Sequence, residues 1–393
     1  MLTLDAWAFP MATEPSTTVE WPLPIAWERT RGVRAQDGSL AATYSSYPYG
    51  DFPVPGASTA VAGLTWVGVH PGHRRKGILR AMIDDLFRSS AARGESVSAL
   101  FAAEPAIYGR FGYGLAAHDL RLRVPRGAAL REVPGTDELS VRLELADLER
   151  HGPLVASLHG SVDRPGWARR DDRQQVSYFH DPASERNGAE ALRIAIVERA
   201  GVPTGYAFFR RVSAWEAAGP RGTVKVRESC VADAASARRL WGVLLDLDLM
   251  ASVEISGMAV DDPLLALLVD QRATEPRWGD NLWVRVLDVP AALSERRYAT
   301  DLDVVLEVRD RDPPANEGRW HLLAGPSAAR VEATGRTADL SMDVRELGSA
   351  YLGGTSLSGL AAAGLVTEHT PGALHRAAVA FGWPQAPLSS WVW

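Results

Sequence analysis

The spacing of apolar residues predicts a β-α-β unit in the first third of the chain. Residues 59–69 read as a strand that becomes continuously apolar towards its end, and residues 96–102 form a second short apolar strand. This order favours parallel strands joined by a right-handed crossover. Gly94 supplies a stop for the connecting helix, which we expect over about residues 75–93. The helix is predicted from apolar residues at helical spacing: Ile78, Leu79, Met82, Ile83, Leu86 and Phe87.

A short basic turn joins the first strand to this helix and predicts an anion site. A turn before a helix directs unpaired backbone N–H groups and the positive end of the helix dipole at whatever lies there. Gly77 lets a ligand approach the backbone closely, and Arg74, Arg75 and Lys76 add positive charge. The pattern is typical of a pyrophosphate site, without a Walker lysine or a dinucleotide glycine motif. The alternative interpretation is a solvated basic start of a helix.

Further along the chain, the same spacing of apolar residues predicts a second unit similar to the first. Residues 118–124 read as a strand that we expect to close the first unit. Residues 223–231 read as a strand that leads into a helix with Leu240, Trp241 and Leu244 on one side. The turn between them has no glycine and carries Asp233, which would repel pyrophosphate. We therefore expect a second β-turn-α unit that binds no such ligand.

The last region changes character, because short alternating strands are followed by helical segments. This order is typical of an α+β domain. A polar hairpin loop is predicted at residues 310–318. The expected strands are residues 303–308, 320–323, 329–334 and 338–343, and the expected helices are residues 344–352, 357–365 and 375–381.

Composition and charge narrow the function. A chain of 393 residues suggests two or three domains. Its net charge of −6 argues against nucleic-acid binding and suits cationic substrates such as amines. The single cysteine, Cys230, fits a reducing compartment, and neither a signal peptide nor a membrane span is visible, so we expect a cytoplasmic protein. His70 and His73 lack a third ligand at metal spacing, so no metal is expected.

Two motifs resemble those of a known family. Arg74-x-x-Gly77-x-Leu79 resembles the acetyl-CoA signature R/Q-x-x-G-x-G/A of the GNAT acetyltransferases, although Leu79 departs from the usual small residue. Some thirty residues later stands Ile107-Tyr-Gly-Arg-Phe-Gly-Tyr-Gly114. Together they resemble the Eis (enhanced intracellular survival) branch of that superfamily, whose members are multi-acetylating aminoglycoside N-acetyltransferases. The match is close from about Val67 to Tyr113 and weaker elsewhere.

The resemblance implies a mixed α/β and α+β fold with three domains. Residues 1–123 would form the catalytic GNAT domain, residues 124–290 a second GNAT-like domain without cofactor, and residues 291–393 a sterol-carrier-like domain. Family members form hexamers, so we expect a homo-oligomer. Acetyl-CoA would be the co-substrate. The residues expected to bind it are Val67, Gly68, Val69, Arg74, Arg75, Lys76, Gly77, Ile78, Leu79, Arg80 and Glu104.

The resemblance also assigns two catalytic roles. Tyr108 matches the family's general acid, which returns a proton to the departing thiolate, while Tyr113 is expected to pack the following turn. Backbone N–H groups around Val67 to Val69 could polarise the thioester carbonyl. No internal carboxylate stands out as the base. Eis enzymes use the carboxylate of their own last residue, usually phenylalanine, and here that residue is Trp393. A tryptophan-rich tail should be buried, although it could merely dock on a neighbouring domain.

These observations lead to one main hypothesis and two alternatives. The main hypothesis is an acetyl-CoA-dependent N-acetyltransferase that acts on the amines of aminoglycosides or polyamines. The first alternative is acetylation of lysine side chains of proteins. The second is a non-catalytic lipid- or ligand-binding protein with relic acetyltransferase folds.

Overall fold

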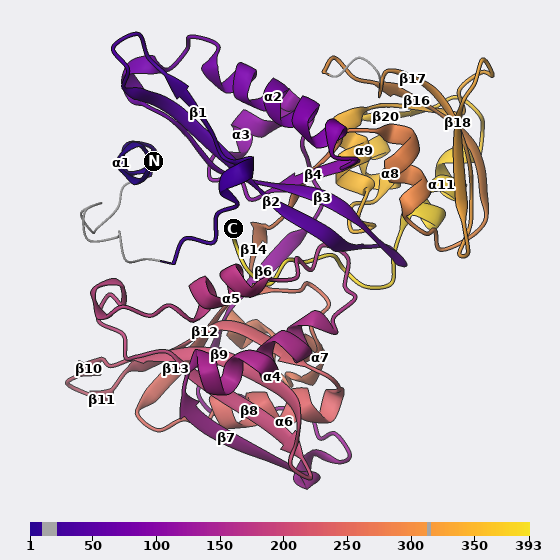
Figure 1. The fold of residues 1–393 in the computed structure, drawn as a ribbon. Coiled ribbons are helices and arrows are strands. Elements are labelled where there is room, and N and C mark those ends of the chain that lie inside the picture. The colour runs from indigo at the N-terminus through magenta and orange to yellow at the C-terminus, as the bar shows by residue number, and fades with distance from the viewer. Residues whose placement is uncertain (10–21, 313–315) are drawn as a thin grey trace.

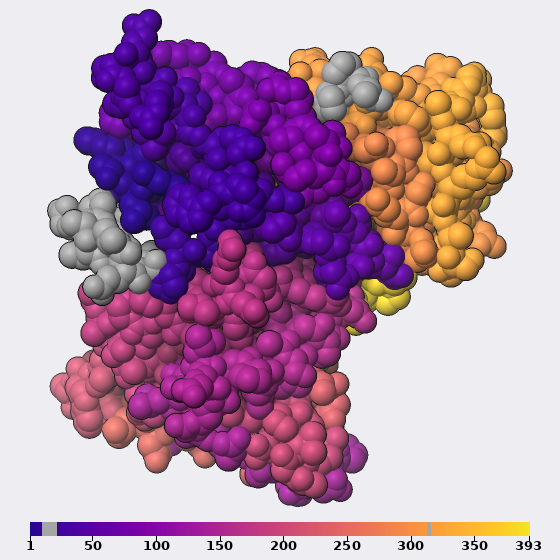
Figure 2. All heavy atoms as spheres, viewed as in Figure 1, coloured from indigo at the N-terminus to yellow at the C-terminus, as the bar shows by residue number. Residues whose placement is uncertain are grey.

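The computed structural model describes residues 1–9, 22–312 and 316–393. Three lobes are built around sheets of six, seven and five strands. The first two lobes are stacked, and the third packs beside the first (Figures 1 and 2). Three lobes built on sheets agree with the mixed α/β and α+β fold expected from the sequence.

The first sheet contains the predicted β-α-β unit. Its strand order is β1-β2-β3-β4-β15-β5, and β3 and β4 are parallel. Helix α2 (Ile78–Ala92) crosses between them and buries Met82, Ile83, Leu86 and Phe87, while Gly94 follows with the left-handed φ of 73° expected of a helix stop. Short helices α1 (Leu2–Ala8) and α3 (Pro105–Tyr108) complete the lobe. The strands are β1 (Arg31–Arg34), β2 (Leu40–Val54), β3 (Ala57–Val69), β4 (Val97–Leu100), β5 (Gly114–Leu115) and β15 (Trp283–Val286).

One expectation about this sheet is wrong. The strand predicted at residues 118–124, β6 (His118–Pro125), does not close the first unit but pairs with β13 and β14 in the second sheet. In return β15, which follows the second lobe in sequence, pairs with β4 and β5 in the first sheet. The two lobes thus exchange strands. Domain boundaries at residues 123 and 290 remain predictions.

The second sheet repeats the first unit, as predicted. Its order is β14-β6-β13-β12-β9-β8-β7, with β12 and β13 parallel and helix α6 (Ala234–Leu244) between them. Helices α4 (Leu148–Gly160), α5 (Asp172–Phe179) and α7 (Pro263–Leu267) and a small hairpin, β10 (Trp215–Glu216) with β11 (Gly219–Pro220), complete the lobe. The remaining strands are β7 (Leu139–Leu145), β8 (Arg193–Arg199), β9 (Val202–Val212), β12 (Gly222–Val231), β13 (Met250–Met258) and β14 (Arg277–Asp280).

The third lobe is the expected α+β unit, with sheet order β18-β17-β16-β19-β20. The pattern missed helix α8 (Val289–Glu295) and the short strand β20 (Val366–Glu368). The other elements lie close to their predicted positions: β16 (Leu302–Arg309), β17 (Gly318–Ala324), β18 (Ala329–Ala333), β19 (Leu340–Asp343), α9 (Val344–Ala350), α10 (Leu357–Ala362) and α11 (Ala373–Phe381).

Buried contacts join the third lobe to the first sheet. Gly114 on β5 and Gly348 on α9 allow backbone to meet backbone, because a Cβ atom at Gly348 would lie 2.4 Å from the carbonyl oxygen of Val284. The loop predicted as a polar hairpin joins β16 to β17, but its first residue, Asp310, is buried and receives two 2.8 Å hydrogen bonds from the buried Arg285 of β15. Within the described ranges, no helix is both long and apolar enough to span a membrane.

Candidate active site

The basic turn has the geometry of an anion site. After a short 3-10 turn (Pro71–His73), Arg75 and Gly77 adopt left-handed φ angles of 61° and 80°, which reverse the chain into helix α2. The first helical hydrogen bond runs from the N–H of Ala81 to the carbonyl of Gly77. The N–H groups of the first helical turn therefore have no acceptor within the helix.

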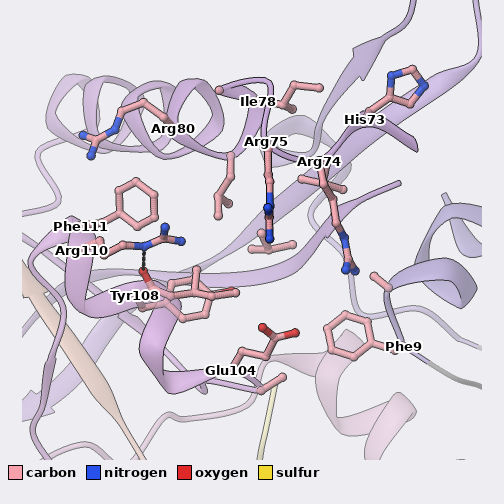
Figure 3. Close-up of a pocket in the computed structure, with 17 residues that line it drawn as sticks. Phe9, His73, Arg74, Arg75, Ile78, Arg80, Glu104, Tyr108, Arg110 and Phe111 are labelled. Carbon is pink, nitrogen blue, oxygen red and sulfur yellow. Dashed lines mark hydrogen bonds between the residues drawn. The ribbon is translucent and has the colours of Figure 1, made fainter. Parts of the chain in front are cut away.

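A cavity of about 590 Å³ lies against this turn. Figure 3 shows Arg74 and Arg75 extending from the turn into the cavity, with Glu104 and Tyr108 across from them. Two predicted binding residues lie elsewhere: Lys76 donates to the carbonyl of Gly72, and Gly68 faces Ala8. The predicted residues that do line the cavity are Val67, Val69, Arg74, Arg75, Gly77, Ile78, Leu79, Arg80, Glu104 and Tyr108.

Other lining residues escaped the sequence analysis. Arg110 and Phe111, from the same motif as Tyr108, form one wall with Arg80, whose guanidinium lies 4.9 Å from the Phe111 ring centroid. Arg80 also pairs with Asp312 of the third lobe, so that lobe contacts the rim of the cavity. The remaining lining residues are Ala8, Phe9, His73, Ala103 and Ile107.

The two tyrosines of the motif lie in different surroundings. Tyr108 lines the cavity, and burial, followed by the charge of Glu104, raises its pKa to about 12. Its phenol is therefore protonated at neutral pH. Tyr113 is fully buried, and its hydroxyl lies 2.8 Å from the Ser98 hydroxyl. Its ring packs edge-on against Tyr108, so Tyr113 supports the position of its neighbour.

Strand β3 separates from β4 beside the cavity. The two strands pair from Val61 to Gly63 and then diverge. The N–H of His70 donates to β2, so alternation turns the N–H of Val69 towards the unpaired edge. Strand β3 has a bulge before Val69, where two of its residues, Trp66 and Val67, lie opposite a single residue of β2, Tyr44. Val67 lines the first cavity, whereas Trp66 lines a second one.

The C-terminal residue lies where β3 and β4 separate. The Trp393 ring is 4.8 Å from Phe101, just beyond β4, and 5.0 Å from Tyr49. A Cβ atom at Gly63 would lie 3.3 Å from the indole Nε1 of Trp393. The chain end thus lies between the first two lobes (Figure 1). Trp393 lines the second cavity and Tyr108 the first, so the two predicted catalytic residues line different cavities.

The second cavity, of about 610 Å³, is acidic in part. Asp5 and Asp119 line it. Within the described part of the chain, the buried Oδ1 of Asp5 has no hydrogen-bond partner, whereas that of Asp119 lies 3.5 Å from the Nε of Arg121 in an ion pair. Burial raises the pKa of Asp5 to about 6, and burial also raises that of Asp119, against the charge of Arg121. Phe9 lines both cavities. Sequence reasoning missed these acids because they lie on distant segments.

Searches against known proteins identify all three lobes. Residues 1–116 and 160–286 each match an acetyltransferase (GNAT) domain family, and residues 289–390 match a sterol carrier protein domain family. Acetyl-CoA is the acetyl donor of GNAT acetyltransferases. Across the described residues, no group of three or more His, Cys, Asp and Glu side chains could hold a metal ion.

Full-length relatives give the same assignment. A protein of Streptomyces coelicolor named as an uncharacterized N-acetyltransferase is 40% identical over 371 residues, which cover 92% of this chain and 88% of the relative. N-acetyltransferase Eis of Mycobacterium tuberculosis is 34% identical over 401 residues, covering 97% and 93%. The crystal structure of Eis1 from Mycobacterium abscessus is 30% identical, has a TM-score of 0.82 and covers 100% of this chain and 96% of that one. The chain therefore belongs to the Eis-type N-acetyltransferases.

Proposed function

We propose that this protein transfers the acetyl group of acetyl-CoA to amines of aminoglycosides or polyamines. Tyr108 acts as general acid and the C-terminal carboxylate of Trp393 as general base. The observation that carries the proposal is the pair of cavities lined from the bulge of β3, Val67 lining one and Trp66 the other. One is lined by arginines at a helix start, and the other contains the carboxylates of Asp5 and Asp119 and the chain end.

The first cavity fits the phosphates of acetyl-CoA. Arg74 and Arg75 have no carboxylate partner among the described residues, in contrast to Arg80, which pairs with Asp312. Unpartnered guanidinium groups beside free N–H groups bind phosphate oxygens well. The apolar residues Val67, Val69 and Leu79 offer the walls that a pantetheine arm requires. When bound, acetyl-CoA supplies the reactive thioester.

The two proton transfers are assigned to the residues that line the two cavities, Tyr108 in the first and Trp393 in the second. The carboxylate of Trp393 accepts a proton from the attacking amine, and the Tyr108 hydroxyl donates one to the departing sulfur. Low-polarity surroundings raise the pKa of a thiol as well as that of a phenol, so the departing thiolate is a stronger base there than in water and accepts the proton more readily. We propose that the N–H of Val69, on the unpaired edge of β3, donates to the thioester oxygen.

The second cavity favours a cationic acceptor. A buried carboxylate oxygen without a donor is stabilised by an ammonium group that donates to it. Asp5 has such an oxygen, and Asp119, which also pairs with Arg121 at 3.5 Å, adds a second carboxylate. Two acids suit a molecule with several amines better than a single lysine side chain. The family relationship further leads us to propose a hexamer, which light scattering in solution tests.

A thiol-release assay with acetyl-CoA tests the proposed function. The panel contains aminoglycosides, linear polyamines and lysine peptides. We expect the first two groups to release CoA and mass spectrometry to find acetylated amines. Activity with lysine peptides alone would favour protein acetylation. Absence of acetyl-CoA binding would leave the alternative of a binding protein with relic folds.

The cationic turn should govern affinity for the donor. Changing both Arg74 and Arg75 to Ala removes two charge-assisted contacts and should weaken acetyl-CoA binding roughly 30- to 1000-fold. Isothermal titration calorimetry measures this affinity. Lys76→Ala is the matched control, because its side chain donates to Gly72 outside the cavity and should leave affinity within about twofold. Unchanged affinity in the double variant would remove this turn as the donor site.

The acids should govern affinity for the acceptor. Asp119→Asn should raise KM for a polyamine roughly tenfold, because a neutral amide loses the attraction to an ammonium group, while KM for acetyl-CoA stays constant. Asp248→Asn, an exposed acid paired with Arg126, is the control. Asp5, with a pKa of about 6, ionises as pH rises through that value, so KM for the polyamine should fall between pH 5 and 7. An equal KM in all three proteins would contradict the role of the acids.

A further inference from the structure

The second GNAT lobe contains a counterpart of the place where β3 and β4 diverge. Strands β12 and β13 pair from Gly222 to Val226 and then separate. Beyond that point, residues 228–231 of β12 and residues 255–258 of β13 line a cavity of about 160 Å³. Leu388 and Ser390 of the C-terminal segment line the same cavity. The chain's own tail therefore lines the space beyond the paired part of β12 and β13.

The start of helix α6, which follows β12, does not suit a phosphate group. We call the cavity between β12 and β13 the slot of the second lobe. Asp233 caps α6 by accepting the N–H of Ser236, and its carboxylate also pairs with Arg199 at 3.0 Å. An acid there repels anions and occupies the N–H groups that Gly77 leaves free in the first lobe. The second lobe thus has the same divergence of two parallel strands as the first lobe, but its helix start does not offer a phosphate site.

A buried carboxylate holds the tail in the slot. Glu228, on β12, receives 2.7 and 2.9 Å hydrogen bonds from Arg170 and a 2.6 Å bond from the Tyr206 hydroxyl. The Ser390 hydroxyl donates the fourth bond, at 2.8 Å. Burial alone would raise the pKa of Glu228, but these donors lower it to about 2. His159, which stays neutral, lies 3.1 Å from the same serine hydroxyl.

A second clamp fixes the neighbouring residue. The side chain of Asn281, just after β14, accepts the N–H of Ser389 at 2.8 Å and donates to its carbonyl at 3.1 Å. The Trp391 indole N–H donates to the carbonyl of Ala168 at 2.8 Å. Three successive tail residues are thus held by the second lobe and its flanking segments. Val392, by contrast, is exposed.

We propose that the second GNAT lobe is a receptor for the chain's own C-terminal segment, in which Glu228 and Asn281 are positioning residues for the carboxylate of Trp393. This inference rests on the proposed function, because it assumes that this carboxylate is the base. Trp393 lies three residues beyond Ser390, a chain length of at most about 11 Å, so anchoring Ser390 restricts where the carboxylate can lie. A misplacement of about 1 Å can lower the rate roughly 100-fold.

Variants of the anchor test the proposal in the full-length protein. Ser390→Ala and Asn281→Ala should each lower kcat roughly 10- to 100-fold with an unchanged KM for acetyl-CoA. Carboxypeptidase A should release Trp393 from them at least about tenfold faster than from the parent protein, because the tail leaves its slot more often. Glu228→Gln should also lower kcat and speed the release of Trp393, although it leaves Arg170 without a charged partner.

Ser236→Ala is the matched control. It removes a buried 2.8 Å hydrogen bond to Thr204 in the same lobe without touching the tail. It should lower thermal stability but change neither kcat nor the rate of Trp393 release. Ser390→Thr keeps the hydroxyl and should restore most of the activity.

A chain extended by one glycine after Trp393 separates the two proposals. If Ser390 acts through the carboxylate, Ser390→Ala should have no further effect on kcat in the extended chain. Multiplying effects would indicate a general structural role and overturn the inference. An active extended chain would refute the carboxylate base, and with it the positioning role, whereas the digestion assay would still decide whether the lobe holds the tail. Normal kcat and normal digestion of Ser390→Ala would refute the receptor itself.

Discussion

Adding one glycine after Trp393 is expected to abolish most acetyl transfer while leaving acetyl-CoA binding and thermal stability intact. The extension moves the carboxylate by up to about 3.6 Å, beyond hydrogen-bond reach of an amine placed for attack. Loss of a general base costs roughly 100- to 10,000-fold in turnover. Steady-state kinetics give the change in kcat, and calorimetry with acetyl-CoA verifies the donor site.

The side chain at the same position provides the control. Trp393→Phe keeps the carboxylate and the aromatic packing against Phe101 and Tyr49, so it should retain substantial activity. An extended chain that turns over normally would point to an internal carboxylate or a water-relayed base, and Trp393 would then have a packing role alone.

Tyr108→Phe is expected to lower turnover by roughly 100-fold or more with little effect on folding or on acetyl-CoA affinity. The substitution removes one hydroxyl from a residue that lines the cavity and keeps the ring that packs against Tyr113. Since the pKa of Tyr108 is about 12, its acid form should persist, and we expect no loss of activity from this group up to about pH 11.

Tyr113→Phe separates chemistry from packing. It breaks the 2.8 Å contact with the Ser98 hydroxyl inside the core and should lower the melting temperature by a few degrees, with only a small effect on kcat. If Tyr113→Phe had a strongly reduced kcat while Tyr108→Phe had a normal kcat, the two roles would be assigned to the wrong tyrosines.

Local patterns predicted the elements that bear on chemistry. Apolar spacing located α2, and a glycine after a basic turn located the open helix start, because both are properties of neighbouring residues. The aromatic tail was expected to be buried, and Trp391 is buried, whereas Val392 is exposed and Trp393 is only partly buried. The repeated unit around β12 and α6 was also found, and the acid at its helix start proved to be the cap.

Features that depend on distant segments could not be predicted in this way. Alternation indicates that residues 118–124 form a strand but not which sheet receives it, so the exchange of β6 and β15 was missed. Three consecutive cations cannot all face one cavity, and only the fold shows that Lys76 turns away. Arg285 and Asp310 form a buried pair between lobes, which no local pattern distinguishes from two surface charges.

Strand β15 means that the order of synthesis and the order of folding differ. Until the ribosome has added residues 283–286, β4 and β5 lack the strand that lies between them. The first lobe, which is synthesised first, therefore has open sheet edges until a segment that follows the second lobe is made, and such edges can pair with other chains. A gene that lost the segment containing the second lobe and β15 would therefore also remove a strand from the sheet of the first lobe, so the two GNAT lobes must be kept together.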